Sequence, residues 1–344
     1  MTSHTHVVQF GGSGGGPASV YPQPEIDLGQ SQVWNDAPEA LADVTLDFGV
    51  GSATFHADWS EVITYLRSDY DGWSDIAPQI EHVQYQQSAS PTKDDLPAPP
   101  KLPVEVSGSK TTMNHSHHLV KQYLYTVFLA ANLSAPGCAE FWDVTIFRES
   151  NNHHDTLFLS SEPLAAAWSS ALEAGWPPLS ALPLSRSVRW FQSHQIGLRQ
   201  IASYPIERAL YALLYACHGN PPGPTEIIWL THALEALTNS PVERIAKLLQ
   251  DRLFLLLGKP EHNKKAVHRR LSDFYNLRSR IVHGDFNIAH PARNDLLERA
   301  VIDQYNDFFR HEDFAFSVIL SLFQELIRND WKGVEFSESV SGLR

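Results

Sequence analysis

Arg278 and His283 lie five positions apart at the end of a strongly helical segment, and together they carry the chemistry needed to cleave a phosphodiester without a metal ion. Cleavage through an RNA 2′-hydroxyl requires a group that moves protons and a fixed positive charge beside the developing oxyanion. A histidine can move the protons and an arginine can supply the charge. The pair is therefore a candidate catalytic site.

The helix that must position this pair is visible in the apolar pattern. Apolar residues recur at helical spacing and predict one buried stripe, formed by Leu271, Phe274, Tyr275, Ile281 and Val282. Arg278 lies within the stripe, where a guanidinium needs an anionic partner because it stays charged. Arg280 falls on the opposite side and should face water. His283 precedes Gly284, which predicts the end of the helix.

Both residues also have a purely structural interpretation. An arginine in a helical stripe is often one half of a buried ion pair, and a histidine beside a terminal glycine is often only part of a cap. On the chemistry alone, this structural interpretation is the more common one.

The residues from Tyr275 to Gly284, Tyr-x-x-Arg-Ser-x-x-Val-His-Gly, resemble the signature of the HEPN superfamily, in which four to six residues separate an arginine from a histidine. The tyrosine and the Ser-x-x-Val-His-Gly ending are most similar to the ApeA-like branch. The segments 234–237 and 244–257 resemble the same branch, so the resemblance covers roughly the last 150 residues. Many HEPN nucleases have Asn, Asp or His after the arginine, and Ser279 departs from that pattern.

This resemblance implies a metal-independent endoribonuclease in which two protomers bring both Arg-His pairs into one cleft. Arg278 would stabilise the phosphorane, and His283 would act as general base or acid, so that the product carries a 2′,3′-cyclic phosphate. ApeA-like proteins are linked to bacterial anti-phage defence by abortive infection, which implies a trigger that the N-terminal half would sense. The alternatives are a non-catalytic HEPN module for dimerisation or RNA binding, and a chance match in an unrelated helical scaffold.

Other polar residues could assist the pair. Glu235 could pair with Arg278, influence His283, or be a surface charge. Asn276 and Ser279 lie inside the motif and could contact the substrate. A basic run before the motif could hold an RNA backbone or be a solvated face, and it consists of Lys264, Lys265, Arg269 and Arg270.

Charge divides the chain into two halves. Residues 1–180 contain 6 basic against 21 acidic residues, whereas residues 181–344 contain 20 against 18. Non-specific nucleic-acid binding depends on neutralising phosphates, so an acidic protein is not a general nucleic-acid coat. Any RNA binding should therefore be local to the C-terminal half, and the acidic half most simply serves solubility.

The remaining composition argues against several classes of site. Cys138 and Cys217 lie one in each half, which disfavours a disulfide framework and favours a reducing compartment. We expect a cytoplasmic protein, because the sequence has neither a signal peptide nor a membrane-spanning apolar run. We expect neither a metal nor another cofactor. Neighbouring histidines in polar loops rarely converge on one ion. The histidine clusters in question are His115, His117 and His118, and His153 and His154 beside Asp155.

The predicted fold class is α+β, with a β-rich N-terminal domain followed by an all-α, HEPN-like bundle. We predict a flexible segment over 1–18, an acidic β-rich domain over 19–180 with a loop or linker at 87–103, and the helical domain over 185–335. Alternation predicts two strands within 44–55 and a hairpin over 141–159 with its turn at 151–155. The segment 119–133 could be a strand or a helix.

Helical spacing predicts most of the C-terminal half. A short helix over 164–174 precedes the connection at 177–183, and Pro224 is expected in the first turn of a helix. The helices are expected over 186–201, 206–217, 226–237, 242–257, 264–283, 295–309 and 314–329.

Overall fold

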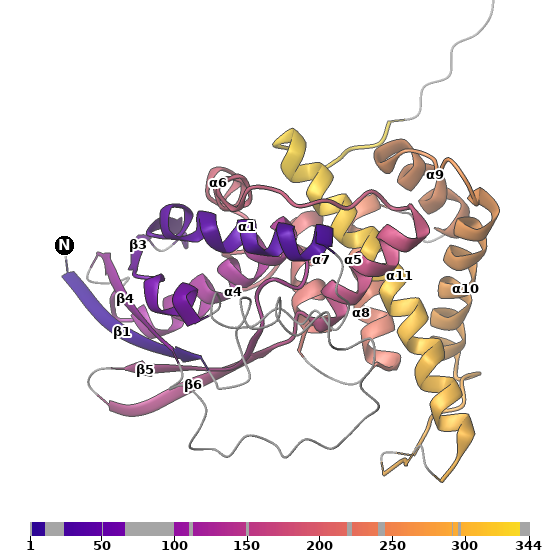
Figure 1. Cartoon of the computed structure of the whole chain (residues 1–344), viewed down its shortest axis with the longest axis horizontal. Coiled ribbons are helices and arrows are strands. Elements are labelled where there is room, and N and C mark those ends of the chain that lie inside the picture. The colour runs from indigo at the N-terminus through magenta and orange to yellow at the C-terminus, as the bar shows by residue number, and fades with distance from the viewer. Residues whose placement is uncertain are drawn as a thin grey trace, which may run out of the picture. The chain divides into compact units, whose positions relative to one another are not determined.

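The computed structural model divides into two units, each described by itself (Figure 1). The first contains 1–169, 180–200 and 217–219, and the second contains 170–179, 201–216 and 220–344. The structure describes residues 2–10, 24–49, 51–65, 100–109, 113–148, 151–218, 222–239, 245–290, 292–294 and 297–337. A sheet in the first unit and helices in the second confirm the α+β prediction.

The described strands of the first unit form a six-stranded antiparallel sheet in the order β2-β3-β4-β1-β5-β6. Strand β1 lies between β4 and β5 (Figure 1). Side chains alternate along β1, with His6, Val8 and Phe10 buried, because successive residues of a strand face opposite sides. The strands are β1 (Thr2–Phe10), β2 (Asp43–Asp47), β3 (Ser52–Ala57), β4 (Lys101–Gly108), β5 (Phe141–Arg148) and β6 (Asn151–Leu159).

Three boundaries predicted for this half were wrong. The expected flexible segment 1–18 contains β1, and its remainder, 11–18, lies outside the described residues. The expected loop 87–103 overlaps the start of β4, while 87–99 also lies outside the described residues. The hairpin of β5 and β6 is confirmed, but residues 151–155 belong to β6 rather than to its turn.

Helices α1 (Pro24–Ala40), α4 (Ser116–Ser134) and α6 (Leu184–His194) complete the core of the first unit. Helix α4 contacts β1, β3, β4 and β5 and also α6, so it is buried along nearly its whole length. Tyr123 of α4 stacks on Phe55 of β3, with ring centroids 4.7 Å apart. The segment 119–133 is therefore a helix with apolar residues on most sides, which explains why its sequence lacked a helical period.

Helix α6 corrects the predicted start of the helical domain at residue 185. It packs on α4 and α1, and the Ser134 hydroxyl donates to the Ser187 hydroxyl at 2.7 Å. The second unit instead resumes at residue 201. Helical spacing identified the helix correctly, but spacing alone does not reveal which core its apolar face joins.

The described elements of the second unit are helical. Helix α8 contacts α7, α9, α10 and α11, and α10 contacts α9 and α11 (Figure 1). Pro224 begins α8, as predicted. Residues 170–174 of α5 (Glu162–Ala174) also belong to this unit, whose other helices are α7 (Pro205–Ala216), α8 (Pro224–Thr238), α9 (Ile245–Leu257), α10 (Lys264–His283) and α11 (Arg299–Asn329).

Helix α11 is one helix of 31 residues where two were predicted. The polar residues 310–313 interrupted the apolar pattern and suggested a break. Glu312 and Asp313 are nevertheless buried, at 4 % and 8 % exposure, so the helix continues through them. Acidic residues in the core therefore concealed the continuity.

Candidate functional site

Helix α10 forms over the predicted residues and presents one buried stripe. Gly284 has a left-handed backbone, φ 81°, and Asp285 N–H donates to the Arg280 carbonyl at 2.9 Å, which ends the helix as predicted. Leu271 and Phe274 are buried, but Val282 is 50 % exposed, so its assignment to the stripe was wrong. The buried positions are Val267, Leu271, Phe274 and Leu277.

Arg278 lies at the edge of this stripe and is half-buried, close to Glu235 of α8. Burial raises the pKa of the Glu235 carboxyl, and the nearby charges of Arg278 and His232 lower it in part. Arg278 and Glu235 do not form a direct ion pair in the described structure. Glu235 is thus a neighbour of Arg278 that influences it without the direct pair we expected, and its role at the site stays a prediction.

Tyr275 completes a polar group that we call the Glu235 cluster, consisting of Glu235, Tyr275 and Arg278. Burial strongly raises the pKa of the Tyr275 phenol, Glu235 raises it further, and Arg278 lowers it. Among the residues that the structure describes, neither the Tyr275 hydroxyl nor Glu235 Oε1 finds a hydrogen-bond partner, although both atoms are buried. A buried polar atom without a partner costs about 1–3 kcal/mol, so such atoms often mark a functional site.

His283 lies on a different side of α10 and is exposed. Because each residue advances by about 100° around a helix, five residues separate Arg278 from His283 by about 140°. By the same geometry, Asn276, Ser279 and His283 lie within about 60° of one another, and all three are exposed. The helix therefore groups His283 with the two predicted substrate contacts, and it does not group His283 with Arg278 in one protomer.

The predicted basic run does not form one face. Arg269 is exposed and lies 3.6 Å from the carboxylate of Asp273. Arg270 turns toward α11, where its guanidinium lies 5.3 Å from the ring centroid of Phe314. Only Lys264 and Lys265 line a common groove.

Apolar side chains are exposed around the C-terminal end of α10. Val282 lies in the last turn of the helix, and Ile288 is 79 % exposed in the segment that follows. Ile288 and Tyr305 line a cavity of about 290 Å³ beside the start of α8. Gln304 donates to the Asn287 carbonyl at 2.6 Å and ties this segment to α11. His283 is thus flanked in the sequence by exposed apolar residues, a feature that is common near protein interfaces.

Buried carboxyls in the second unit were not predicted. Burial and the neighbouring Glu226 raise the pKa of Glu312 to about 9, and Glu312 accepts a hydrogen bond from Gly223 N–H at 3.0 Å. Burial raises the pKa of Asp313 to about 7, and the Ser170 hydroxyl donates to it at 3.4 Å. The sequence could have indicated them, because Glu312 and Asp313 occupy positions of the helical apolar pattern within 308–320.

The histidines expected in polar loops lie partly in regular structure. His117 belongs to α4 and bonds Asp155 of β6 at 3.0 Å. Ser116, next to it, bonds the buried His6 of β1 at 3.1 Å. Within the described ranges, no group of three His, Cys, Asp or Glu residues is arranged to hold a metal ion.

Cys138 and Cys217 are both buried free thiols whose pKa burial raises. In the part of the chain that the structure describes, no helix has the length and apolarity to span a membrane.

Comparison with known proteins gives no match: no protein family, curated protein or solved structure is significantly similar to the chain. The resemblance to HEPN proteins therefore rests only on the motif around Arg278 and His283 and on the segments 234–237 and 244–257, and no comparison supports it.

Proposed function

We propose that this protein is a metal-independent HEPN endoribonuclease that cleaves cytoplasmic RNA by attack of the 2′-hydroxyl and acts in anti-phage defence by abortive infection. The observation that carries the proposal is helix α10, which ends at His283 and holds Arg278 beside the unpartnered polar atoms of the Glu235 cluster. A phosphate oxygen would give the Tyr275 hydroxyl an acceptor and would give Arg278 the close anion that it lacks.

Each side chain has a distinct role in the proposed reaction. His283 is exposed, so it can exchange protons with solvent and with the 2′-hydroxyl or the 5′-oxygen. Arg278 supplies the fixed charge for the phosphorane. Glu235 supplies a nearby counter-charge for Arg278, and Asn276 and Ser279 contact the RNA beside His283.

A homodimer fits the angular separation of the pair. Since Arg278 and His283 leave one helix about 140° apart, a site that uses both is more easily assembled from Arg278 of one protomer and His283 of the other. The exposed Val282 and Ile288 next to His283 provide apolar surface for such an interface. In this arrangement the acidic first unit would act as the sensor that releases the nuclease.

The rival function is a non-catalytic HEPN module that dimerises or binds RNA. It is favoured by the charge of Glu235 beside Arg278, because a neighbouring carboxylate already gives the guanidinium a structural role. The two functions predict different effects of His283→Ala on RNA cleavage. His283 is exposed and contributes little to the core.

The deciding experiment is cleavage of end-labelled RNA in EDTA by the wild type, Arg278→Ala and His283→Ala, with the oligomeric state measured in the same samples. Arg280→Ala is the matched control, since it removes an exposed charge two positions from Arg278. We expect cleavage with a 2′,3′-cyclic phosphate product from the wild type and the control only. Equal cleavage by all four proteins would refute the proposal, and an intact dimer that binds RNA without cleaving it would support the rival.

A further inference from the structure

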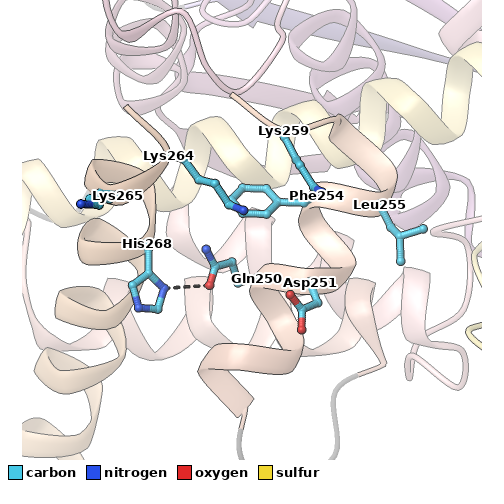
Figure 2. Close-up of a pocket in the computed structure, with 8 residues that line it drawn as sticks. All are labelled: Gln250, Asp251, Phe254, Leu255, Lys259, Lys264, Lys265 and His268. Atoms are coloured by element: carbon cyan, nitrogen blue, oxygen red, sulfur yellow. Dashed lines mark hydrogen bonds between the residues drawn. The ribbon is translucent and has the colours of Figure 1, made fainter. Parts of the chain in front are cut away.

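A basic groove lies between α9 and the start of α10, away from the Arg278 end of the helix (Figure 2). Its volume is about 750 Å³, within the range of small-molecule and nucleotide sites. Two consecutive helices and their short connection supply its walls. The lining residues are Gln250, Asp251, Phe254, Leu255, Lys259, Lys264, Lys265 and His268.

Two of the three lysines of this groove converge from separate positions. Figure 2 shows Lys259, from the connection between the helices, and Lys264, from the first turn of α10, reaching toward Phe254. The ammonium of Lys264 lies 5.7 Å from the ring centroid of Phe254. The lining contains three lysines and one carboxylate, that of Asp251, so the groove has a net positive charge.

Polar and apolar groups complete the lining. His268 Nδ1 donates to Gln250 Oε1 at 2.7 Å, which ties α10 to α9 and leaves the amide nitrogen of Gln250 as a donor. Leu255 is 77 % exposed at the rim. The groove therefore combines ammonium groups, which suit phosphates, with an apolar rim against which a base can pack.

We propose that this groove binds the phosphodiester backbone of single-stranded RNA. Lysine ammonium groups beside apolar surface suit a single strand, whose bases are free to contact protein. This inference rests on the proposed ribonuclease function and extends it, because the groove is a second RNA contact on the helix that carries Arg278. Lys264 precedes Arg278 by 14 residues, about 21 Å along the helix, so the groove binds RNA away from the scissile phosphate.

The inference is tested by the affinity of the full chain for a labelled single-stranded RNA whose 2′-hydroxyls are methylated, which blocks cleavage. Fluorescence anisotropy in EDTA would compare the wild type with Lys259→Glu and Lys264→Glu. The control is Lys247→Glu, which makes the same charge change at an exposed position of α9 outside the groove lining. We expect each groove variant to weaken binding by about tenfold and to reduce the salt dependence by about 0.7 per lost phosphate contact, with little change in the control.

Several results would overturn the inference. They are unchanged binding in both groove variants, an equal loss in the control, or equally tight binding of double-stranded RNA. Displacement of the RNA by a nucleoside triphosphate at a lower concentration than by unlabelled RNA would assign the groove to free nucleotides instead.

The two proposals fail separately. If groove variants bind RNA normally while His283→Ala abolishes cleavage, the groove inference is wrong and the ribonuclease stands. If His283→Ala cleaves RNA as well as the wild type while groove variants lose binding, the ribonuclease site is wrong and the groove stands.

Discussion

Glu235 of α8 faces Arg278 of α10 without forming a direct ion pair, and each charge changes the environment of the other. Burial raises the pKa of Glu235 and the charge of Arg278 lowers it, so the guanidinium favours the ionised form of the carboxyl. The pKa of Tyr275 responds to both charges, and its hydroxyl has no hydrogen-bond partner in the described part of the chain. The Glu235 cluster thus contains a cation, an anion and an unused donor, which together could accommodate one further anion.

Removing the cation should expose this dependence. We expect Arg278→Ala to lower the free energy of unfolding by about 1 kcal/mol, a small effect because Glu235 is only half-buried. Glu235→Gln in the Arg278→Ala background should recover part of the loss, because the neutral amide needs no cation. Urea unfolding of the four proteins of this cycle measures the coupling. Arg269→Ala, at an exposed surface pair, is the control, and a coupling near zero would show that the two charges act independently.

Mixing two inactive proteins should restore activity if the site is shared between protomers. In an Arg278→Ala and His283→Ala heterodimer, one cleft regains an intact arginine and an intact histidine, whereas sites formed within one protomer would both remain defective. We therefore expect an equimolar mixture, after subunit exchange, to regain roughly a quarter of the wild-type RNA cleavage, since about half of the dimers are mixed and each has one of two sites. Cleavage no higher than that of either variant alone would exclude a shared site.

The exposed apolar end of α10 should control the oligomeric state. Val282→Asp places a charge at the proposed interface, so we expect dissociation to monomers and loss of RNA cleavage together. Ile201→Asp makes the same kind of change at a position that is 81 % exposed elsewhere in the second unit, and it should remain dimeric and active. Light scattering and cleavage assays would measure both properties. A Val282→Asp dimer with full activity would place the interface elsewhere.

Periodicity alone located much of this structure. Helix α10 begins and ends where apolar spacing and Gly284 predicted, because its stripe is narrow and its termini carry clear signals. Helix α4 has apolar residues on nearly every side, so burial erased the period that would have distinguished it from a strand. Strand β1 was missed because a short polar start hid the alternation of His6, Val8 and Phe10.

The candidate site was predictable in part. The motif named Arg278 and His283, whose roles stay predictions. The expected anionic partner of Arg278 is present only as the neighbouring Glu235, without a direct ion pair. The separation of Arg270 from Lys264 follows from helical geometry and could have been derived before the structure was known. The groove could not, since Lys259 and Gln250 meet Lys264 only after α9 and α10 pack together.

Glu312 should make stability depend on pH. Its pKa is about 9 in the folded protein, against an ordinary value of 4.5, because burial and Glu226 disfavour the charged form. The folded protein therefore retains a proton that the unfolded chain releases, and the free energy of unfolding should fall as pH rises from about 5 to 9, by up to about 1.4 kcal/mol per pH unit. Asp313, with a pKa of about 7, adds a fall of the same sign at lower pH.

Glu312→Gln isolates this contribution. The amide oxygen can still accept the hydrogen bond from Gly223 N–H, but the side chain no longer titrates, so we expect a shallower fall in stability, most clearly between pH 7 and 9. Urea unfolding at several pH values measures the slope. Glu261→Gln, at an exposed position, should keep the wild-type slope. If Glu312→Gln leaves the dependence of stability on pH unchanged, Glu312 is already ionised in the folded protein and the prediction is wrong.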